Sequence, residues 1–265
     1  MKILTVTRKQ GLLEHRSAIE DLFFASFGQR AIGSVWDWAY LDNPNGEPVV
    51  SLCYDEDRLV GHYAIVPMPL SRGDVCKQSY ISMTTMVAES HRKFGLFTQL
   101  AQENYRIAAK AGVDFVFGFP NSQSTPGFRK RLDWTLPESD YVATVDKATL
   151  LAAAKAGSFD KNGLLGLDLN DPVIRAWRLS RPGSTYIFGQ GLAFKRHQEA
   201  VDLLWWDAPE ALASLPDDAS VNVLVSASSG LEPNRQFDYQ FGGIGLRSAF
   251  DATAINREMA ISDLF

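Results

Sequence analysis

A change of hydrophobic periodicity near residue 90 is the feature that most constrains the fold of this 265-residue chain. Between residues 49 and 87 the sequence reads as β strands, which polar turns at 55–57 and 71–74 separate. The turns predict an antiparallel meander of three strands: 49–54, 59–69 and a third that ends at Val87. Helical spacing then runs from 95 to 111, and the apolar run 113–119 is typical of a strand buried on both faces.

The residues before the meander predict a strand at 3–7 and helices at 14–27 and 34–41. The first part of the chain therefore reads as strand, two helices, three antiparallel strands, helix and buried strand. This order indicates an α+β fold, in which helices cover a mixed, mainly antiparallel sheet.

Patterns are weaker in the second half, which we treat as a separate region of residues 146–265 after a first domain of residues 1–145. A helix is expected at 148–156, and Asp171 with Pro172 predicts the start of another. The strands expected there are 185–189, 192–196, 200–206 and 221–226.

The two halves share a weak sequence similarity. Trp38 with Pro44 precedes one strand meander, and Trp177 with Pro182 precedes another. This favours a second, smaller α+β region that is a degenerate repeat of the first. Chance similarity among aromatic-rich strands is the alternative.

Composition excludes several classes of function. With 46% hydrophobic residues the chain is not disordered, and 26 basic against 31 acidic residues argue against nucleic acid or a membrane as partner. The N-terminal apolar run is only four residues long, which predicts a cytoplasmic protein. The two cysteines are expected to be buried thiols, and the four histidines show no metal-ligand spacing, so no metal site is expected.

The junction between the third strand and the long helix carries the most chemical information. His91, Arg92 and Lys93 are basic residues in an acidic chain, and Gly95 would let the backbone approach a ligand closely. Because the first N–H groups of a helix are unpaired and carry partial positive charge, this junction suits a phosphate or pyrophosphate.

The same junction resembles the acyl-CoA-binding motif of the GNAT superfamily of N-acyltransferases, Q/R-x-x-G-x-G/A. Arg92 and Gly95 occupy the first two fixed positions, while Phe97 replaces the final small residue. Asn121 is similar to the family's asparagine beside the cofactor, and residues 132–134 stand where members usually have L-G-F. The resemblance covers about residues 1–145.

The resemblance implies an enzyme that moves an acyl group from acetyl-CoA or another acyl-CoA to a primary amine by direct attack on the thioester. It implies a wedge between the strand ending at Val87 and the strand at 113–119. The acceptor class that it suggests is a small molecule, such as an amino sugar linked to a nucleotide. The implied cofactor contacts are Met86, Val87, Arg92, Lys93, Phe94, Gly95, Leu96, Phe97 and Asn121.

The catalytic acid and base are harder to place. Phe128 stands where many members carry a tyrosine, and the central strand has Ser82, Thr84 and Thr85 instead of a carboxylate. Glu89 and His91 are the candidate bases, acting through water. The alternatives are a phosphate contact for His91 and a solvated loop position for Glu89. The basic run 129–131 is either a phosphate contact or solvated helix surface.

Two other functions stay open. The chain is alternatively a non-catalytic acyl-CoA-binding module, which the missing tyrosine and carboxylate permit. It also resembles tandem-GNAT enzymes that use charged tRNA, although its net charge of −5 counts against them. The sequence leaves open the acceptor amine, the acyl chain length and whether the chain forms a homodimer.

Overall fold

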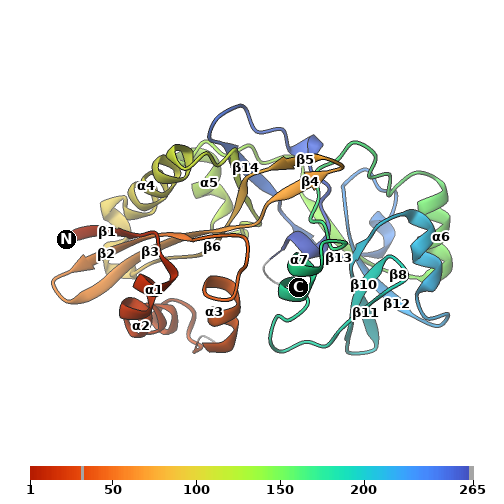
Figure 1. The fold of residues 1–265 in the computed structure, drawn as a ribbon, viewed down its shortest axis with the longest axis horizontal. Coiled ribbons are helices and arrows are strands. Elements are labelled where there is room, and N and C mark those ends of the chain that lie inside the picture. The colour runs from red at the N-terminus through yellow and green to blue at the C-terminus, as the bar shows by residue number, and fades with distance from the viewer. Residues whose placement is uncertain (31–32, 263–265) are drawn as a thin grey trace.

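Two six-stranded sheets stand side by side in the computed structural model, which describes residues 1–30 and 33–262 (Figure 1). The first sheet has the strand order β1-β2-β3-β6-β7-β14, and the second has the order β13-β8-β12-β11-β10-β9. A small hairpin, β4–β5, joins neither sheet. The expected α+β class, with mainly antiparallel sheets flanked by helices, is confirmed.

The first half supplies every strand of the first sheet except the last. Its strands are β1 (Lys2–Val6), β2 (Val49–Asp55), β3 (Arg58–Pro67), β4 (Leu70–Arg72), β5 (Val75–Lys77), β6 (Ser79–Val87) and β7 (Phe115–Gly118). Its helices are α1 (Lys9–Leu12), η1 (Leu13–His15), α2 (Arg16–Phe27), α3 (Gly33–Tyr40), η2 (Glu89–Phe94), α4 (Leu96–Lys110) and α5 (Thr125–Arg131).

Helices cover both faces of the first sheet, with α1 to α3 on one side and α4 and α5 on the other (Figure 1). Helix α4 packs on β2 and β3 through an apolar stripe that includes Leu100, Ala101 and Ala108, all fully buried. Asn104 lies in the same stripe, and its amide donates to the carbonyls of Val49 and Tyr63. These hydrogen bonds fix the helix on the sheet without leaving a buried polar group unpaired.

The second half builds the second sheet and returns to the first. Its strands are β8 (Asp140–Asp146), β9 (Tyr186–Gly189), β10 (Leu192–His197), β11 (Ala200–Trp206), β12 (Ser220–Val225), β13 (Arg235–Tyr239) and β14 (Gly242–Gly245). Its helices are α6 (Lys147–Lys155), α7 (Pro172–Arg178), η3 (Pro209–Ser214), η4 (Glu232–Asn234), η5 (Ala252–Ala254) and η6 (Met259–Ile261).

The two sheets repeat one pattern of strand pairing. From β2 to β14 the first sheet reads antiparallel, antiparallel, parallel, antiparallel. From β9 to β8 the second sheet has the same succession, with β11 and β12 as its parallel pair. The structure is thus consistent with the tandem repeat that the sequence similarity between the halves suggested.

The two tryptophans of that sequence similarity contact each other. Trp38 on α3 and Trp177 on α7 stack with ring centroids 5.2 Å apart, and the indole N–H of each donates to the backbone carbonyl of the other. This reciprocal contact gives the two halves an approximate twofold relation at their junction. One core cluster accordingly runs through both sheets.

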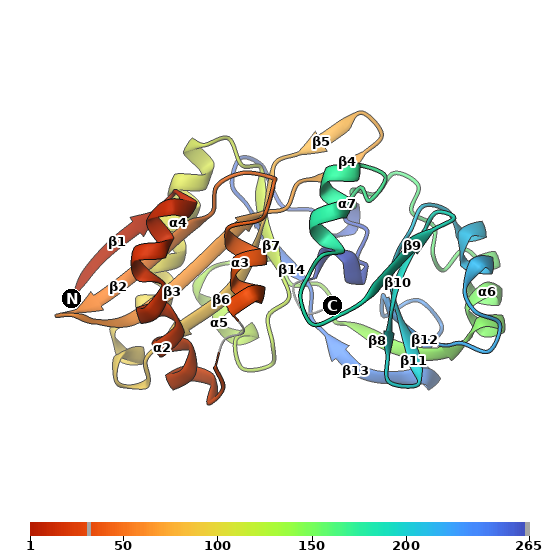
Figure 2. The ribbon, with the colours of Figure 1, turned by 60° about the horizontal axis from the view of Figure 1, so that its bottom comes forward.

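The halves exchange strands at their ends. Strand β14 comes from the far end of the chain but pairs with β7, which places its blue ribbon within the first half (Figure 2). Strand β8 follows the first half but pairs with β12. The boundary expected between residues 145 and 146 falls at the end of β8, and the division into two domains stays a prediction.

Several local predictions were wrong or incomplete. The strand expected between the turn at 71–74 and Val87 is split into β5 and β6, and β8, β13 and β14 were not predicted. Cys76 is exposed on β5 because the β4–β5 hairpin stands away from both sheets, whereas Cys53 is buried as expected. No helix within residues 1–30 and 33–262 is long and apolar enough to cross a membrane.

Candidate functional site

A wedge opens where β6 and β7 stop pairing. The two parallel strands are paired at three positions, the last of which joins Ile81 to Phe117. Strand β6 then continues to Val87 along β3 alone. From Ser82 onward, the edge of β6 that faced β7 is therefore available to a ligand's amide groups.

An irregularity in β6 shapes one wall of the wedge. The register of β3 and β6 shifts between His62 and Ala64, and Thr84 adopts a left-handed backbone conformation with φ of 51°. A β-branched residue rarely takes this conformation, so it indicates local strain. The imidazole Nδ1 of His62 donates to the carbonyl oxygen of Thr84 at 2.6 Å and holds this conformation. Burial lowers the pKa of His62 to about 4, so the ring is neutral at pH 7.

The wedge holds a cavity of about 350 Å³. Residues 82–85 of β6 form one wall, and residues 118–121 after β7 form the opposite wall. The end of α2 contributes Phe23 and Phe27, and Phe128 and Trp134 close the inner end. Gly118 keeps this space open, since a Cβ there would lie 3.1 Å from the carbonyl oxygen of Ser82.

A groove of about 610 Å³ adjoins the wedge, because both cavities include Phe27, Thr85, Asn121 and Ser124. It passes between the start of α4 and helix α5, where three cations line it: Arg92, Lys130 and Arg131. The first part of the site is thus uncharged and partly aromatic, and the second is cationic. This division matches a ligand with a neutral arm and an anionic end.

The structure brings together about half of the predicted cofactor contacts. Met86, Val87, Arg92, Phe97 and Asn121 all line the groove. Gly95 has φ of 69° and provides the turn from η2 into α4. Leu96 is buried in the core, and the ammonium of Lys93 lies over the ring of Phe94.

Glu89 and His91 lie at the edge of the site and are not among the residues lining either cavity. The His91 ring is engaged on both sides, with Nδ1 2.8 Å from the hydroxyl of Ser90 and Nε2 3.1 Å from a carboxylate oxygen of Asp55. The hydrogen bond from His91 lowers the pKa of Asp55. This placement gives no support to direct contact between these candidate bases and a substrate.

A chain of hydroxyl groups starts in the wedge instead. Ser82 Oγ donates to the phenol oxygen of Tyr63 at 3.0 Å, and that oxygen lies 2.6 Å from the phenol of Tyr105. The indole of Trp134 donates to Tyr105 at 2.9 Å. Burial raises the pKa of both tyrosines, so both phenols are protonated.

This chain of hydroxyl groups lies beside Phe128, the residue that stands where many GNAT members carry a tyrosine. Phe128 packs edge-on against Phe97 and Trp134, with ring centroids 5.2 and 4.4 Å away. From the sequence, Ser82 is only a replacement for a carboxylate, because nothing local shows that its hydroxyl contacts Tyr63, 19 residues away. Lys130 and Arg131 line the groove while remaining exposed, so both interpretations of the basic run stay open.

Comparison with known proteins agrees with this geometry. Residues 14–136 match the family model described as an acetyltransferase (GNAT) domain. No curated protein matches the sequence.

Two solved structures share the fold over nearly the whole chain. A GCN5-related N-acetyltransferase from Kribbella flavida is 14% identical, with a TM-score of 0.60, and the match covers 93% of this chain and 72% of that one. A GCN5-related N-acetyltransferase from Anabaena variabilis is 14% identical, with a TM-score of 0.58, and covers 92% of this chain and 73% of that one. The resemblance inferred from the sequence is thereby confirmed: residues 14–136 match the GNAT acetyltransferase domain, and these two structures share the fold.

Proposed function

We propose that this protein transfers an acyl group from acyl-CoA to a primary amine of a small molecule. The observation that carries the proposal is the cavity between the parted strands β6 and β7, continuous with a groove lined by Arg92, Lys130 and Arg131. Acetyl-CoA is the simplest donor, because the wedge cavity of about 350 Å³ is small.

The residues present fit acyl-CoA in charge and shape. Its diphosphate is strongly anionic, and the groove supplies three cations next to the start of the 15-residue helix α4. Its pantetheine arm is neutral and carries amides, and the freed edge of β6 beyond Ile81 offers backbone groups to pair with them. Phe97 departs from the small residue of the motif, and its ring forms part of the groove wall.

The chemistry requires no covalent enzyme intermediate. The amine nitrogen forms a bond to the thioester carbon, the carbon–sulfur bond breaks, and the sulfur leaves with the electron pair. The nitrogen loses a proton and the sulfur gains one. Positioning in the wedge and backbone N–H groups directed at the carbonyl oxygen would provide most of the rate enhancement.

Ser82 is our candidate for stabilising the leaving sulfur. Its hydroxyl lies in the wedge wall and is held by Tyr63 and Tyr105, which are protonated and buried. To donate a hydrogen bond where negative charge develops, the Ser82 hydroxyl would turn from Tyr63 toward the sulfur and accept the Tyr63 proton in its place. This role replaces the proton donor that Phe128 cannot supply.

The acceptor would lie against Phe23 and Phe27, which form an aromatic wall of the wedge. Such a wall suits a sugar or base ring, which agrees with an amino sugar as acceptor. The identity of the amine, a homodimer and the cytoplasmic location stay predictions.

Binding of acetyl-CoA, measured by calorimetry, tests the cofactor site. The double variant Arg92→Ala with Gly95→Asp should lose measurable binding, because it removes a groove cation and puts a carboxylate at the start of α4. Lys93→Ala is the matched control, since Lys93 is adjacent in sequence but outside the groove lining. Unchanged affinity in the double variant would contradict the assignment.

Release of free thiol with a panel of amines tests the activity. A transferase should release CoA faster with at least one amine, and Ser82→Ala should slow that release more than it weakens acetyl-CoA binding. Binding without thiol release across the panel would favour the alternative of a non-catalytic acyl-CoA-binding module.

A further inference from the structure

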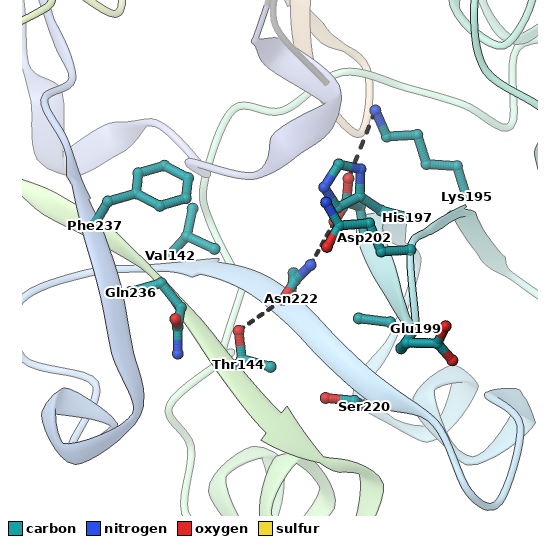
Figure 3. A pocket seen from close by; sticks show the side chains of 12 residues that line it. Val142, Thr144, Lys195, His197, Glu199, Asp202, Ser220, Asn222, Gln236 and Phe237 are labelled. Carbon is teal, nitrogen blue, oxygen red and sulfur yellow. Dashed lines mark hydrogen bonds and ion pairs between the residues drawn. The ribbon is translucent and has the colours of Figure 1, made fainter.

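A second cavity, of about 680 Å³, lies on the second sheet and shares no lining residue with the wedge or the groove. One face of this sheet is covered by an apolar core beneath α6 and η3. On the opposite face, the residues near the junction with the first half are apolar and buried, such as Leu204 and Leu224. Farther along the same strands the residues on this face are polar, and they form the floor of the cavity (Figure 3).

The floor is a connected polar network that crosses four neighbouring strands. Thr144 Oγ1 donates to the amide oxygen of Asn222 at 2.7 Å, and the Asn222 amide donates to Asp202 at 2.8 Å. The second carboxylate oxygen of Asp202 lies 3.6 Å from the ammonium of Lys195. The side chains of Lys195 and Asp202 are only 9% and 5% exposed.

This network is more than the fold requires. Burying two charged side chains costs free energy that apolar residues would not, and at the junction end the same sheet face is apolar. Polar groups that hold each other in fixed directions are preorganised for a ligand. The network therefore points to binding.

The wall of the cavity has a second feature that indicates a binding site. Neighbouring residues of a regular strand point to opposite faces, yet Gln236 and Phe237 of β13 both line the cavity. A register shift between Arg235 and Phe237 makes this arrangement possible. It places the Phe237 ring, 48% exposed, opposite Glu199 and beside Val142 (Figure 3).

We propose that this cavity binds a pyranose sugar unit. Sugar hydroxyls both donate and accept, so they match a floor that offers a hydroxyl, an amide, a carboxylate and an ammonium group together. The C–H face of a sugar ring carries partial positive charge and packs on the negative face of an aromatic ring, which Phe237 presents. The carboxylates of Asp202 and Glu199 disfavour an anionic ligand, and Lys195 disfavours a simple cation.

Saturation-transfer NMR with N-acetylglucosamine and chitotriose tests the proposal, with cyclohexanol as a ring that has one hydroxyl. We expect transfer to the ring protons of the sugars and little to cyclohexanol. Tighter binding of chitotriose would assign the cavity to the end of a saccharide chain, and equal binding would assign it to a single sugar. No transfer to either sugar up to about 20 mM would overturn the proposal.

Two variants locate the binding. Phe237→Ala should weaken sugar affinity at least about tenfold, and Thr144→Val should weaken it by removing one hydroxyl at nearly constant volume. Phe188→Ala is the matched control, because Phe188 is a partly exposed phenylalanine on β9 of the same sheet, outside the cavity lining. Circular dichroism verifies that each variant is folded. Wild-type affinity in Phe237→Ala would overturn the assignment, and since no step uses acyl-CoA, failure here would leave the proposed transferase function untouched.

Discussion

The two sheets have the same succession of strand pairings, but they differ where the parallel pair separates. In the first sheet the residues after the last paired positions are Ser82 and Gly118, and both line a cavity. In the second sheet the corresponding residues are Leu203 and Val223, both fully buried in the apolar core. Larger apolar residues at these two positions thus go with core packing in place of a cavity.

The connections between the parallel strands differ in the same sense. In the first sheet β6 leads through a basic turn into the 15-residue α4, and in the second β11 leads into η3, six residues long. A short 3-10 segment gives a weak dipole and few free N–H groups, so it is a poor anion site. The two halves thus share the sheet but differ in the cavity beside the parallel pair and in the helix that follows it, the two features on which the proposed acyl-CoA site depends.

The largest effect is expected in the second sheet, where core side chains fill the position that corresponds to the wedge. Leu203→Ala should lower the free energy of unfolding by ~2–5 kcal/mol, because it leaves a cavity in the core of the second sheet. Ser82→Ala at the corresponding position of the first sheet should cost about 1 kcal/mol, the value of one hydrogen bond. Chemical denaturation of both variants measures the difference. Equal losses would show that the two wedges are packed alike.

A larger side chain at Gly118 should fill the wedge of the first sheet. Gly118→Val gives the first sheet the residue that the second sheet has at Val223, and its side chain would enter the space beside Ser82 and Trp134. We expect acetyl-CoA affinity to fall at least tenfold, with a loss of ~1–3 kcal/mol in stability from overpacking. Gly189→Val is the control, since a Cβ at Gly189 meets nothing within 4 Å. Wild-type binding by Gly118→Val would place the thioester arm elsewhere.

Acid should affect the two sheets with opposite sign. In the first sheet the pKa of His62 falls to about 4 on burial, so its unfolded form binds a proton more readily and stability is lost as pH falls from about 6.5 to about 4. In the second sheet burial raises the pKa of Asp140 to about 7 against the influence of Arg257, 2.8 Å away. Its folded form therefore binds the proton more readily, and stability is lost as pH rises from about 4 to about 7.

Unfolding measured across this pH range separates the two groups. His62→Asn should leave a profile in which stability falls with rising pH, and Asp140→Asn should leave one in which it rises, each by up to ~1.4 kcal/mol per pH unit. Parallel profiles for the two variants would contradict the opposite signs.

The smallest effect is expected at the edge of the site. Asp55→Asn weakens the partly exposed pair between Asp55 and His91, which should cost less than about 1 kcal/mol. His91→Ala should be equally mild and should leave acetyl-CoA affinity within about twofold, since His91 is outside both cavity linings. A hundredfold loss of turnover in His91→Ala, with binding retained, would instead support its predicted role as a base.

The sequence was informative wherever structure is set by local pattern. The meander, helix α4 and strand β7 follow from periodicity, and Arg92 and Gly95 marked the junction correctly. The pattern could not show that Gly242 to Gly245 form a strand, because three glycines in four residues carry no β signal. Here close approach requires glycine, since a Cβ at Gly243 would lie 2.7 Å from the carbonyl oxygen of Val116. The Ser82 to Tyr105 chain likewise depends on contacts between residues far apart in sequence.

The position of β14 near the end of the sequence constrains how the protein folds during its synthesis. Strand β7 receives its outer partner from residues that the ribosome adds more than a hundred positions later. Until then Phe115 and Phe117 border an unfinished edge, so the nascent first half should depend on chaperone protection or remain only partly folded. The proposed acyl-CoA site in the first sheet would then be completed only after β14 has been synthesised.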